Sequence, residues 1–304
     1  MTEATTAPPP DGLDKGKLKF LDVDGIRTRY YEDGAGEPLV LLHGGQFGSG
    51  YSLDAWSLVL PALARDFHVY ALDKLGQGQT GNPKGDDYTF DALLAHTYGW
   101  LQALGIRGAH LVGHSRGGLL ITRLAQEHPA VAKSLVIVDS NTLAPDDPAF
   151  PAGEFYAEIA RRTPPGPATR ATVRLEPEAQ AFSPAHITDD FTDRLLENAL
   201  LPVRQESDER MKALATTTWL PSMGRAKAEA LRQIEAHGMP VPTLVIWGLN
   251  DVSAPLRIHG LPLIDLIAAK TPRTVAVLVN QTGHYVMREQ PDAFVRALRA
   301  FCLG

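Results

Sequence analysis

The sequence predicts an α/β fold with a doubly wound, mostly parallel sheet, into which a helical lid is inserted after the sixth strand. Two observations carry this prediction. Short apolar runs of strand length alternate with helical stretches from Pro38 to Val138, and the alternation resumes at Thr243. Between these halves lie residues 141–240, which are helical in pattern, punctuated by prolines and without a convincing buried strand.

The elements are justified in chain order by their periodicity and turn residues. Residues 18–23 and 26–32 alternate as a hairpin turned at Asp24–Gly25. Short apolar runs predict strands at 38–42, 68–72, 109–112, 134–138, 243–247 and 274–279; we expect 38–42 to be buried on both faces and 109–112 and 134–138 to be buried. Apolar residues at helical spacing predict helices at 53–65, from a Thr89 cap to about 104, and at 119–128, 261–269 and 291–301.

These elements divide the chain into a core of two parts and an insertion. We expect the core to comprise residues 18–140 and 241–304, and the lid to comprise residues 141–240. Residues 1–17 are rich in Thr, Ala, Pro and Gly and have no apolar segment of signal-peptide length. They predict a disordered tail and a cytoplasmic protein.

The composition describes an ordinary globular protein of 304 residues, 44% hydrophobic and 21% charged. The net charge of -6 comes without an acidic tail or a basic stripe, which argues against nucleic acid as a partner. No apolar run is long enough for a membrane span. The single cysteine, Cys302, excludes an internal disulfide, and the histidines have no metal-like spacing, so we expect neither metal nor cofactor.

One turn matches the Gly-x-Ser-x-Gly pattern of a nucleophile elbow, Gly113-His114-Ser115-Arg116-Gly117. It joins an apolar strand to a helix, which leaves the central residue strained and gives no room for side chains two residues to either side. Glycine at 113 and 117 relieves that crowding. A serine needs a base and an orienting group to become a nucleophile, so the rest of the chain must supply both.

An acid and a histidine follow at the ends of the next two strands of the second half. Asp251 comes after the strand at 243–247, and His284 after the strand at 274–279. Since parallel strands end at the same edge of a sheet, both should face Ser115. His284 would take the serine proton and Asp251 would hold its tautomer. Asp139 also ends a strand near the elbow and stays open as the alternative acid.

The oxyanion of such a reaction needs backbone donors. We expect one from the N–H of Arg116 and the other from Gly45 or Gln46, in the glycine-containing loop that begins at His43. Gly44 would let the backbone approach the substrate there. The Arg116 side chain lies near the nucleophile and is a second candidate for contact with an anionic substrate.

Taken together, these stretches resemble the α/β-hydrolase superfamily from about Lys17 onward, and most of all its meta-cleavage product hydrolases. The resemblance is carried by residues 24–26, 41–45, 73–78, the elbow, 247–251 and 283–285. It implies cleavage of a carbon-carbon bond in a ring-opened aromatic acid, with an aromatic side chain, here Tyr285, directly after the histidine. It also implies a lid arginine that binds the substrate carboxylate, here Arg194, one residue out of the family's register. Where the family usually has Asn before the serine, this chain has His114.

The sequence therefore predicts a serine hydrolase acting on a small-molecule substrate, and a homo-oligomer is an open expectation. Besides the triad and the oxyanion loop, we expect substrate contacts from His114, Arg194, Trp219 and Tyr285. Specificity should reside in lid side chains such as Phe155, Tyr156, Phe182, Trp219 and Met223. An esterase or lactonase needs only the triad, the oxyanion donors and an apolar pocket, so it remains an alternative, as does a ligand receptor on the same fold with little turnover.

Overall fold

The computed structural model of the chain describes residues 13–148, 150 and 153–304, and its strands form one sheet. The strand order is β1-β2-β4-β3-β5-β6-β7-β8. Pairing is antiparallel for β1 with β2 and β2 with β4, and parallel everywhere else. The strands are β1 Leu18–Val23, β2 Ile26–Gly34, β3 Glu37–Leu42, β4 Phe67–Leu72, β5 Ala109–His114, β6 Ala132–Val138, β7 Thr243–Gly248 and β8 Thr274–Val279. The predicted mostly parallel α/β sheet is confirmed.

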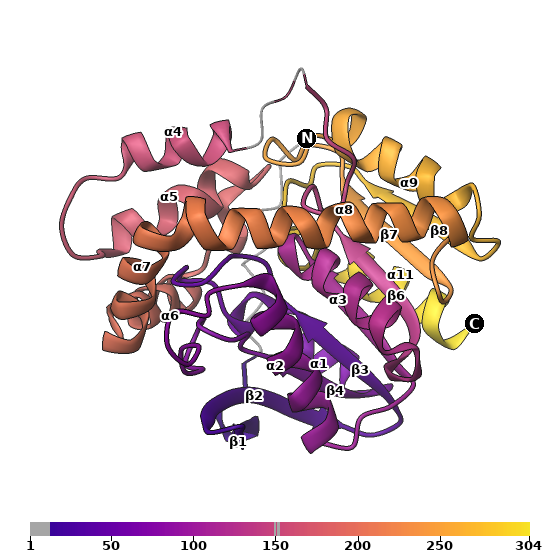
Figure 1. Ribbon diagram of the computed structural model, residues 1–304, viewed down its shortest axis with the longest axis horizontal. Helices are drawn as coiled ribbons and strands as arrows, with labels where there is room; N and C mark the ends of the chain where they lie inside the picture. The colour runs from indigo at the N-terminus through magenta and orange to yellow at the C-terminus, as the bar shows by residue number, and fades with distance from the viewer. Residues whose placement is uncertain (1–12, 149, 151–152) are drawn as a thin grey trace, which may run out of the picture.

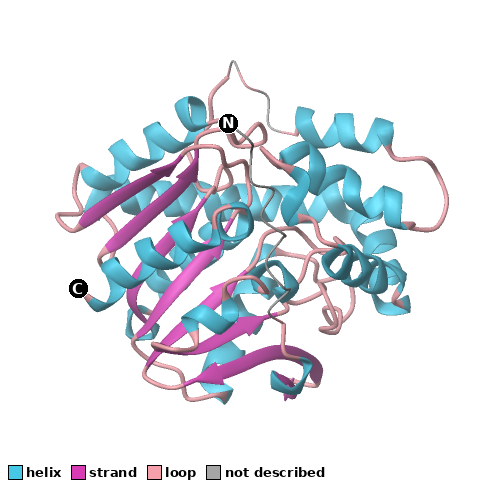
Figure 2. Cartoon of the chain, turned by 180° about the vertical axis from the view of Figure 1, so that it is seen from behind, coloured by secondary structure: helices cyan, strands magenta, loops and turns pink. Residues whose placement is uncertain are grey.

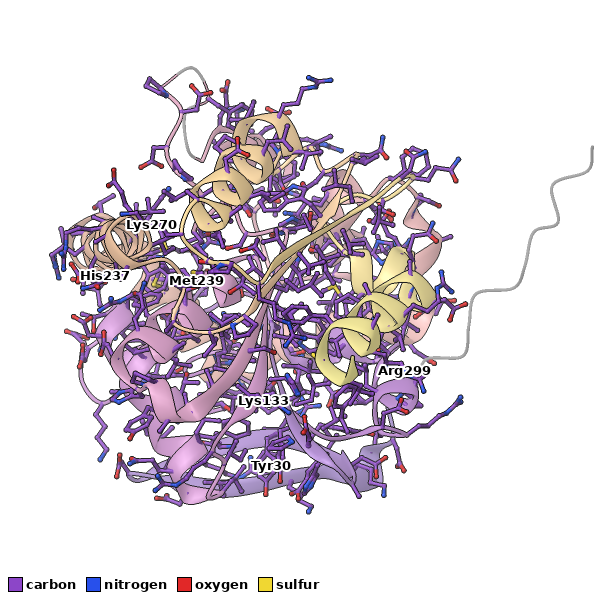
Figure 3. The ribbon with its side chains drawn as sticks, turned by 90° about the vertical axis from the view of Figure 1, so that its right-hand side faces the viewer. Tyr30, Lys133, His237, Met239, Lys270 and Arg299 are labelled. Atoms are coloured by element: carbon purple, nitrogen blue, oxygen red, sulfur yellow. The ribbon has the colours of Figure 1, made fainter. Side chains whose placement is uncertain are left out.

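Each central strand contributes to two hydrophobic cores, because successive side chains point to opposite faces. Leu111 of β5 packs into one core and Val112 into the other. The first face is covered by α2 (Phe90–Ala103), α3 (Arg116–Glu127), α8 (Leu220–His237) and α9 (Leu261–Ala268). The second face is covered by α1 (Leu60–Leu63) and α11 (Pro291–Leu303), seen from behind in Figure 2. Figure 3 shows this layering from the side, with α8 at His237 and α11 at Arg299 on opposite sides of the strands.

The described part of the segment inserted after β6 consists of helices joined by turns and loops, and it contains no strand. Its helices α4 to α7 gather on the left of Figure 1, and α8 then runs across the sheet face along α3. The helices are α4 Glu154–Arg162, α5 Arg170–Gln180, α6 Asp189–Leu200 and α7 Pro202–Leu214, with a 3-10 turn at Pro184–His186 and a π-helical segment at Ala215–Trp219. Because α8 packs on α3 and α2, residues Leu220–His237 serve the core layer, and the lid boundary at 240 stays a prediction.

The expected helix at 53–65 is wrong. The structure has a 3-10 turn at Leu53–Trp56 and then the short α1, Leu60–Leu63. Pro61 explains the break: it lacks an N–H and is tolerated only in the first turn of a helix, so α1 begins just before it. The remaining short elements are 3-10 turns at Lys15–Lys17 and Pro129–Val131, the π-helical Leu256–Gly260, and α10 Val286–Glu289.

The predicted disordered tail lies outside the described residues as far as position 12. Lys15–Lys17 differ from that prediction, since they form a turn whose cap, Asp14, accepts the Gly16 N–H at 2.8 Å. Among the described residues, no helix combines the length and apolar character that a membrane crossing requires.

Candidate active site

Ser115 sits at the tip of β5, between the strand and α3, with φ 53° and ψ −122°. Its N–H donates to the Val138 carbonyl at 2.8 Å, so the strained residue is held by the neighbouring strand β6. A Cβ on Gly113 would lie 2.2 Å from the Gly117 carbonyl oxygen, and one on Gly117 would lie 2.3 Å from that of Leu42. The two glycines of the elbow are therefore steric requirements of this turn.

His284 is held by a carboxylate through its Nδ1. The Nδ1 to Asp251 Oδ2 distance is 2.6 Å and both side chains are buried. Because a carboxylate only accepts, Nδ1 carries the hydrogen, which leaves Nε2 of the neutral ring as an acceptor. His284 is thus in the tautomer that a general base for a serine requires.

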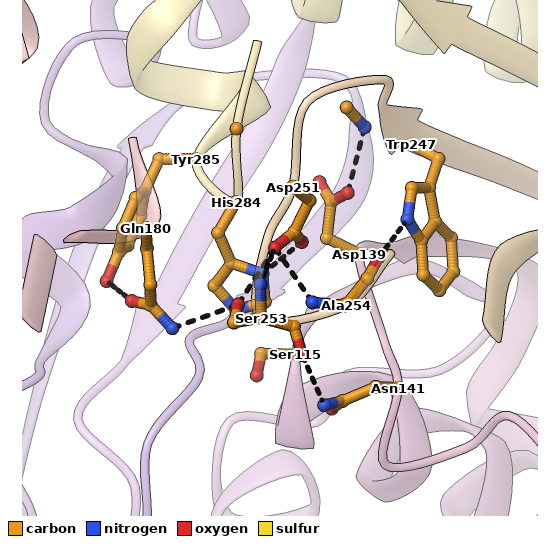
Figure 4. Close-up of polar contacts among 12 residues, drawn as sticks. Ser115, Asp139, Asn141, Gln180, Trp247, Asp251, Ser253, Ala254, His284 and Tyr285 are labelled. Atoms are coloured by element: carbon orange, nitrogen blue, oxygen red, sulfur yellow. Dashed lines mark hydrogen bonds and ion pairs between the residues drawn. The ribbon is translucent and has the colours of Figure 1, made fainter. Parts of the chain in front are cut away.

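Asp251, and not Asp139, is the acid that meets His284. The second oxygen of Asp251 accepts hydrogen bonds at 2.8 Å from the Ser253 N–H, the Ser253 hydroxyl and the Ala254 N–H (Figure 4). Asp139 instead accepts the Gly248 N–H at 2.8 Å through Oδ1, while its buried Oδ2 has no hydrogen-bond partner in the described part of the chain. Burial, followed by repulsion from Asp251, raises the pKa of the Asp139 carboxyl well above its usual value.

Ser115 and His284 line one small cavity of about 10 Å³ between the sheet edge and the lid. Core residues form its floor and lid residues its roof. The core residues are Gly44, Gly45, Tyr51, His114, Ser115, Arg116, His284 and Tyr285, and the lid residues are Tyr156, Glu176 and Gln180. The structure therefore brings together the elbow, the expected base, part of the glycine loop and the aromatic residue after the histidine.

The glycine loop is fixed by two side chains that bind its carbonyls. His43 Nδ1 donates to Gly44 O at 2.8 Å, and the Lys74 ammonium donates to Gly45 O at 3.1 Å. Since N–H and C=O of a trans peptide point in opposite directions, these bonds also fix the N–H groups of Gly45 and Gln46. Burial, then the nearby Arg116, lowers the pKa of Lys74 well below its usual value. Gly44 and Gly45 line the cavity, whereas Gln46 is not among the lining residues.

Gly44 also lies directly beside Ser115. A Cβ added there would come 3.0 Å from both the Ser115 Cβ and His114 Nδ1. Such contacts are tighter than ordinary van der Waals packing, so a larger residue would crowd the carbonyl-binding position above the serine. The close approach of backbone expected at this loop is present.

His114 and Tyr285 support the histidine from two sides. His114 Nε2 donates to the His284 carbonyl at 2.8 Å, and burial keeps the pKa of His114 well below its usual value. The Tyr285 hydroxyl donates to Gln180 Oε1 at 2.7 Å (Figure 4). It also lies 2.5 Å from the Tyr51 hydroxyl. Gln180 closes this network, because its amide donates to Ser253 Oγ at 3.2 Å and its backbone carbonyl accepts the His284 N–H at 3.0 Å.

Two expected substrate contacts lie elsewhere. Arg194 is not among the cavity residues; its Nε is 3.4 Å from Asp54 Oδ1 and its Nη2 is 3.5 Å from Ser57 Oγ. Trp219 is buried against Phe47, with ring centroids 5.2 Å apart, and is also absent from the lining. Both side chains therefore serve packing between the lid and the core in this arrangement.

Sequence reasoning missed Tyr51, Glu176 and Gln180, which all line the cavity. Glu176 and Gln180 lie on α5, and polar residues on a proline-containing lid helix carry the same pattern as a solvated surface. Only the path of the lid brings them over Ser115. No local signal in the sequence identifies them.

The sheet order, the strained serine after β5 and the acid and histidine after β7 and β8 together define a hydrolase of the α/β-hydrolase fold. Comparison with known families agrees: the family described as alpha/beta hydrolase fold matches residues 37–291, and the chain belongs to it.

Among curated proteins, the chain resembles meta-cleavage product hydrolases over nearly its whole length. It is 32% identical to the 2-hydroxymuconate semialdehyde hydrolase of Pseudomonas sp. strain CF600, covering 91% of this chain and 90% of that protein. It is 28% identical to the 2-hydroxy-6-oxo-6-(2'-aminophenyl)hexa-2,4-dienoic acid hydrolase of Metapseudomonas resinovorans, covering 93% and 90%. Among solved structures, the meta-cleavage product hydrolase of Pseudomonas fluorescens IP01 superimposes with a TM-score of 0.74 at 26% identity, covering 93% of this chain and 96% of that one.

Proposed function

We propose that Ser115, His284 and Asp251 form a catalytic triad that hydrolyses a carbon-carbon bond in a keto acid of the ring-fission type. The observation that carries the proposal is the 2.6 Å contact of His284 with Asp251 at the cavity that Ser115 lines. The similarity to curated hydrolases of dienoic acids and semialdehydes supports the choice of bond.

The reaction follows from the protonation states of these groups. The substrate dienol first becomes a ketone, which makes one carbon-carbon bond cleavable, because the departing carbon fragment can delocalise its electron pair. Ser115 Oγ then passes its proton to His284 Nε2 and attacks the carbonyl carbon. Backbone N–H groups of Arg116 and of Gly45 or Gln46 would bind the oxyanion.

Collapse of the tetrahedral adduct breaks the carbon-carbon bond. The departing carbon takes the proton held on His284, and the acyl group stays on Ser115. A water molecule, deprotonated by His284, releases the acyl group as a carboxylic acid. Asp251 stabilises the imidazolium in both halves of the reaction through the same Nδ1–H bond.

The proposal is tested by a substrate panel on the wild type and Ser115→Ala. The panel contains 2-hydroxy-6-oxo-2,4-heptadienoate, a neutral aryl ester and a lactone. We expect the dienoate to have the highest kcat/KM and Ser115→Ala to lose at least about a thousandfold in kcat, with the unfolding midpoint nearly unchanged. Substantial residual turnover in Ser115→Ala would contradict covalent catalysis by this serine.

A neutral-ester hydrolase or lactonase is the second candidate. The position of Arg194 favours this candidate. Arg194 contacts Asp54 and Ser57, so it does not supply the lid cation that the family resemblance assigns to the substrate carboxylate. Efficient turnover of the ester or lactone without turnover of the dienoate would support an ester hydrolase or lactonase. A receptor with little turnover would fail to react at Ser115 with a fluorophosphonate, which labels activated serines.

A further inference from the structure

The cavity at Ser115 is too small for a substrate in this arrangement of the lid. Its volume of about 10 Å³ is close to the least that holds one water molecule. Tyr156 of α4 and Glu176 and Gln180 of α5 form its roof. A substrate therefore reaches Ser115 only when part of this roof moves.

A second cavity, which we call the side pocket, lies between α4, α5, α6 and the core loop at Gly50 and Tyr51. Its volume is about 160 Å³, close to the roughly 150 Å³ that holds one benzene molecule in an apolar protein interior. Its apolar lining comes from Ile159, Val173, Pro177, Leu195 and Ala199. Unlike the cavity at Ser115, the side pocket has room for the non-polar part of a small molecule.

Shared walls connect the side pocket to Ser115 at one end and to the protein surface at the other. Tyr51 and Glu176 line both the side pocket and the cavity at Ser115, so they form the partition between the two. Thr163 and Ala199 line both the side pocket and an outer groove of about 800 Å³, which runs along α7 and the loop at 164–168. The three spaces therefore lie in series from the surface to Ser115.

The two sides of the partition are held differently. Tyr51 is buried on the core, and its hydroxyl lies 2.5 Å from that of Tyr285. Glu176 is half-buried on α5 and forms no ion pair with a described residue. Burial raises the pKa of its carboxyl, an effect that attraction to Arg116 and His284 and a hydrogen bond with Tyr51 oppose. Glu176 is thus held in the partition by charge and a single hydrogen bond, and it is the side that is free to swing.

We propose that a substrate enters through the side pocket and that the Glu176 side chain is the gate between this pocket and Ser115. Movement of Glu176 away from Tyr51 joins the two cavities, and its return closes the roof over Ser115. The route admits a non-polar group of up to the size of one aromatic ring, because that is what the side pocket holds. The inference rests on the proposed function only for Ser115 being the end of the route.

The test measures access to position 115 and needs no turnover. Cys302 is the single cysteine of the chain, so Cys302→Ser combined with Ser115→Cys leaves one thiol, at the end of the route. The probe is benzyl methanethiosulfonate, whose ring fits the side pocket, and the measured quantity is the second-order rate constant of thiol modification. Rate constants are compared at pH values where the thiol is fully ionised, so that a change in the thiol pKa does not enter.

Three further substitutions are made in this background. Thr163→Trp and Ala199→Trp each place a ring where the side pocket meets the outer groove, one from the end of α4 and one from α6. Glu176→Ala removes the gate. The matched controls are exposed residues of the same three helices that line none of these spaces, Arg162→Trp, Glu197→Trp and Glu178→Ala.

We expect Glu176→Ala to raise the rate constant about tenfold, because the two cavities are then joined at all times. We expect Thr163→Trp and Ala199→Trp to lower it about tenfold each, because the ring must pass the narrowed end of the side pocket. The three control variants should stay within about twofold of the background. Unfolding midpoints check that each Trp variant is folded, and since the two lie on different helices, either one is sufficient.

Several results would overturn the proposal. Equal rate constants in the background and in a folded Trp variant would mean that the reagent reaches position 115 by another path. A rate constant for Glu176→Ala equal to that for Glu178→Ala would reject Glu176 as the gate, and absence of modification in every variant would reject entry of a ring-sized group. The expected pattern, found together with a wild type that hydrolyses none of the substrate panel, would instead contradict the proposed function alone.

Discussion

At the scale of single residues, two buried aspartates near the elbow, Asp251 and Asp139, lie in different hydrogen-bonding environments. Asp251 Oδ1 accepts hydrogen bonds from Ser253 and Ala254, and Oδ2 binds His284. Asp139 has one backbone donor and a buried oxygen without a hydrogen-bond partner in the described chain. Of the two aspartates, Asp251 is therefore the one that is both held by backbone and hydroxyl donors and in contact with the His284 ring.

We therefore expect Asp251→Asn to lower kcat on the order of ten-thousandfold, because the amide cannot hold the histidine in the required tautomer. Asp139→Asn keeps an oxygen for the Gly248 N–H and should cost less than about tenfold. Steady-state kinetics of the two variants on one substrate measure both losses in kcat. The opposite ranking would transfer the role of the acid to Asp139.

Asp139 should also make stability depend on pH. Its folded pKa is raised above the value of 3.8 expected for the unfolded chain, so the folded state retains a proton that the unfolded state releases. Its contribution to the free energy of unfolding therefore falls as pH rises from about 4 toward the folded pKa. Asparagine cannot ionise, so the stability of Asp139→Asn relative to the wild type should rise over that interval.

Urea unfolding at several pH values measures this difference. The exposed Asp190, changed to asparagine, is the control and should show no comparable trend. A relative stability of Asp139→Asn that declines with increasing pH would mean that Asp139 is ionised in the folded protein.

At the scale of elements, the ends of the strands could be predicted from the sequence and the roof of the cavity could not. Ser115, Asp251 and His284 each follow an apolar run, and parallel strands deliver their carboxyl ends to one edge, so spacing alone predicts that they meet. Glu176 and Gln180 reach the same cavity from α5, whose position depends on how the lid folds back. That path is a tertiary property with no local pattern.

Among the elements, Gln180 of α5 links the lid to the proposed base and acid, His284 and Asp251. At the C-terminal end of α5 it bonds to His284, Tyr285 and Ser253, and Ser253 in turn bonds to Asp251. Loss of its side chain leaves the Tyr285 and Ser253 hydroxyls to find other partners, which loosens the shell around the base and acid.

We expect Gln180→Ala to lower kcat about tenfold with little change in KM, because the groups it orients act on the reacting bond and not on ground-state binding. Glu178 on the same helix is exposed and pairs with Arg174, so Glu178→Ala should retain full activity. A higher KM at unchanged kcat would show that Gln180 contacts substrate and does not position the triad.

At the scale of the whole molecule, the lid is docked on the core by a buried polar cluster beside the 3-10 turn Leu53–Trp56. Asp54 lies at its centre and contacts Arg29 of β2 at 3.3 Å as well as Arg194 of α6. Asn198 of α6 donates to Ser52 Oγ at 3.1 Å and to Asp54 Oδ2 at 3.3 Å. These bonds join segments more than a hundred residues apart in sequence, so the two partners of such a bond never appear together in a local stretch of sequence.

Arg288 extends the same docking surface from the other side. It donates to Ser57 Oγ at 2.9 Å and to the carbonyl of His186 in the lid at 2.8 Å, and its guanidinium carbon lies 3.7 Å from the centre of the Phe191 ring. Arg194 itself lies outside the cavity, with its guanidinium group turned toward Asp54 and Ser57. Arg194 thus belongs to the architecture that fixes the lid over Ser115.

The variant Arg194→Ala distinguishes a role of Arg194 in holding the lid on the core from a role in binding substrate. Asp54 keeps Arg29 as a partner, so the variant should fold, with a loss of about 1–3 kcal/mol in the free energy of unfolding. A looser lid should lower kcat/KM for an acidic dienoate and a neutral ester by the same factor. The control is Arg170→Ala, which removes exposed lid ion pairs with Asp189 and Asp193 and should change stability by less than about 0.5 kcal/mol. A loss confined to the acidic substrate, with stability unchanged, would mean that Arg194 leaves Asp54 to bind the substrate carboxylate.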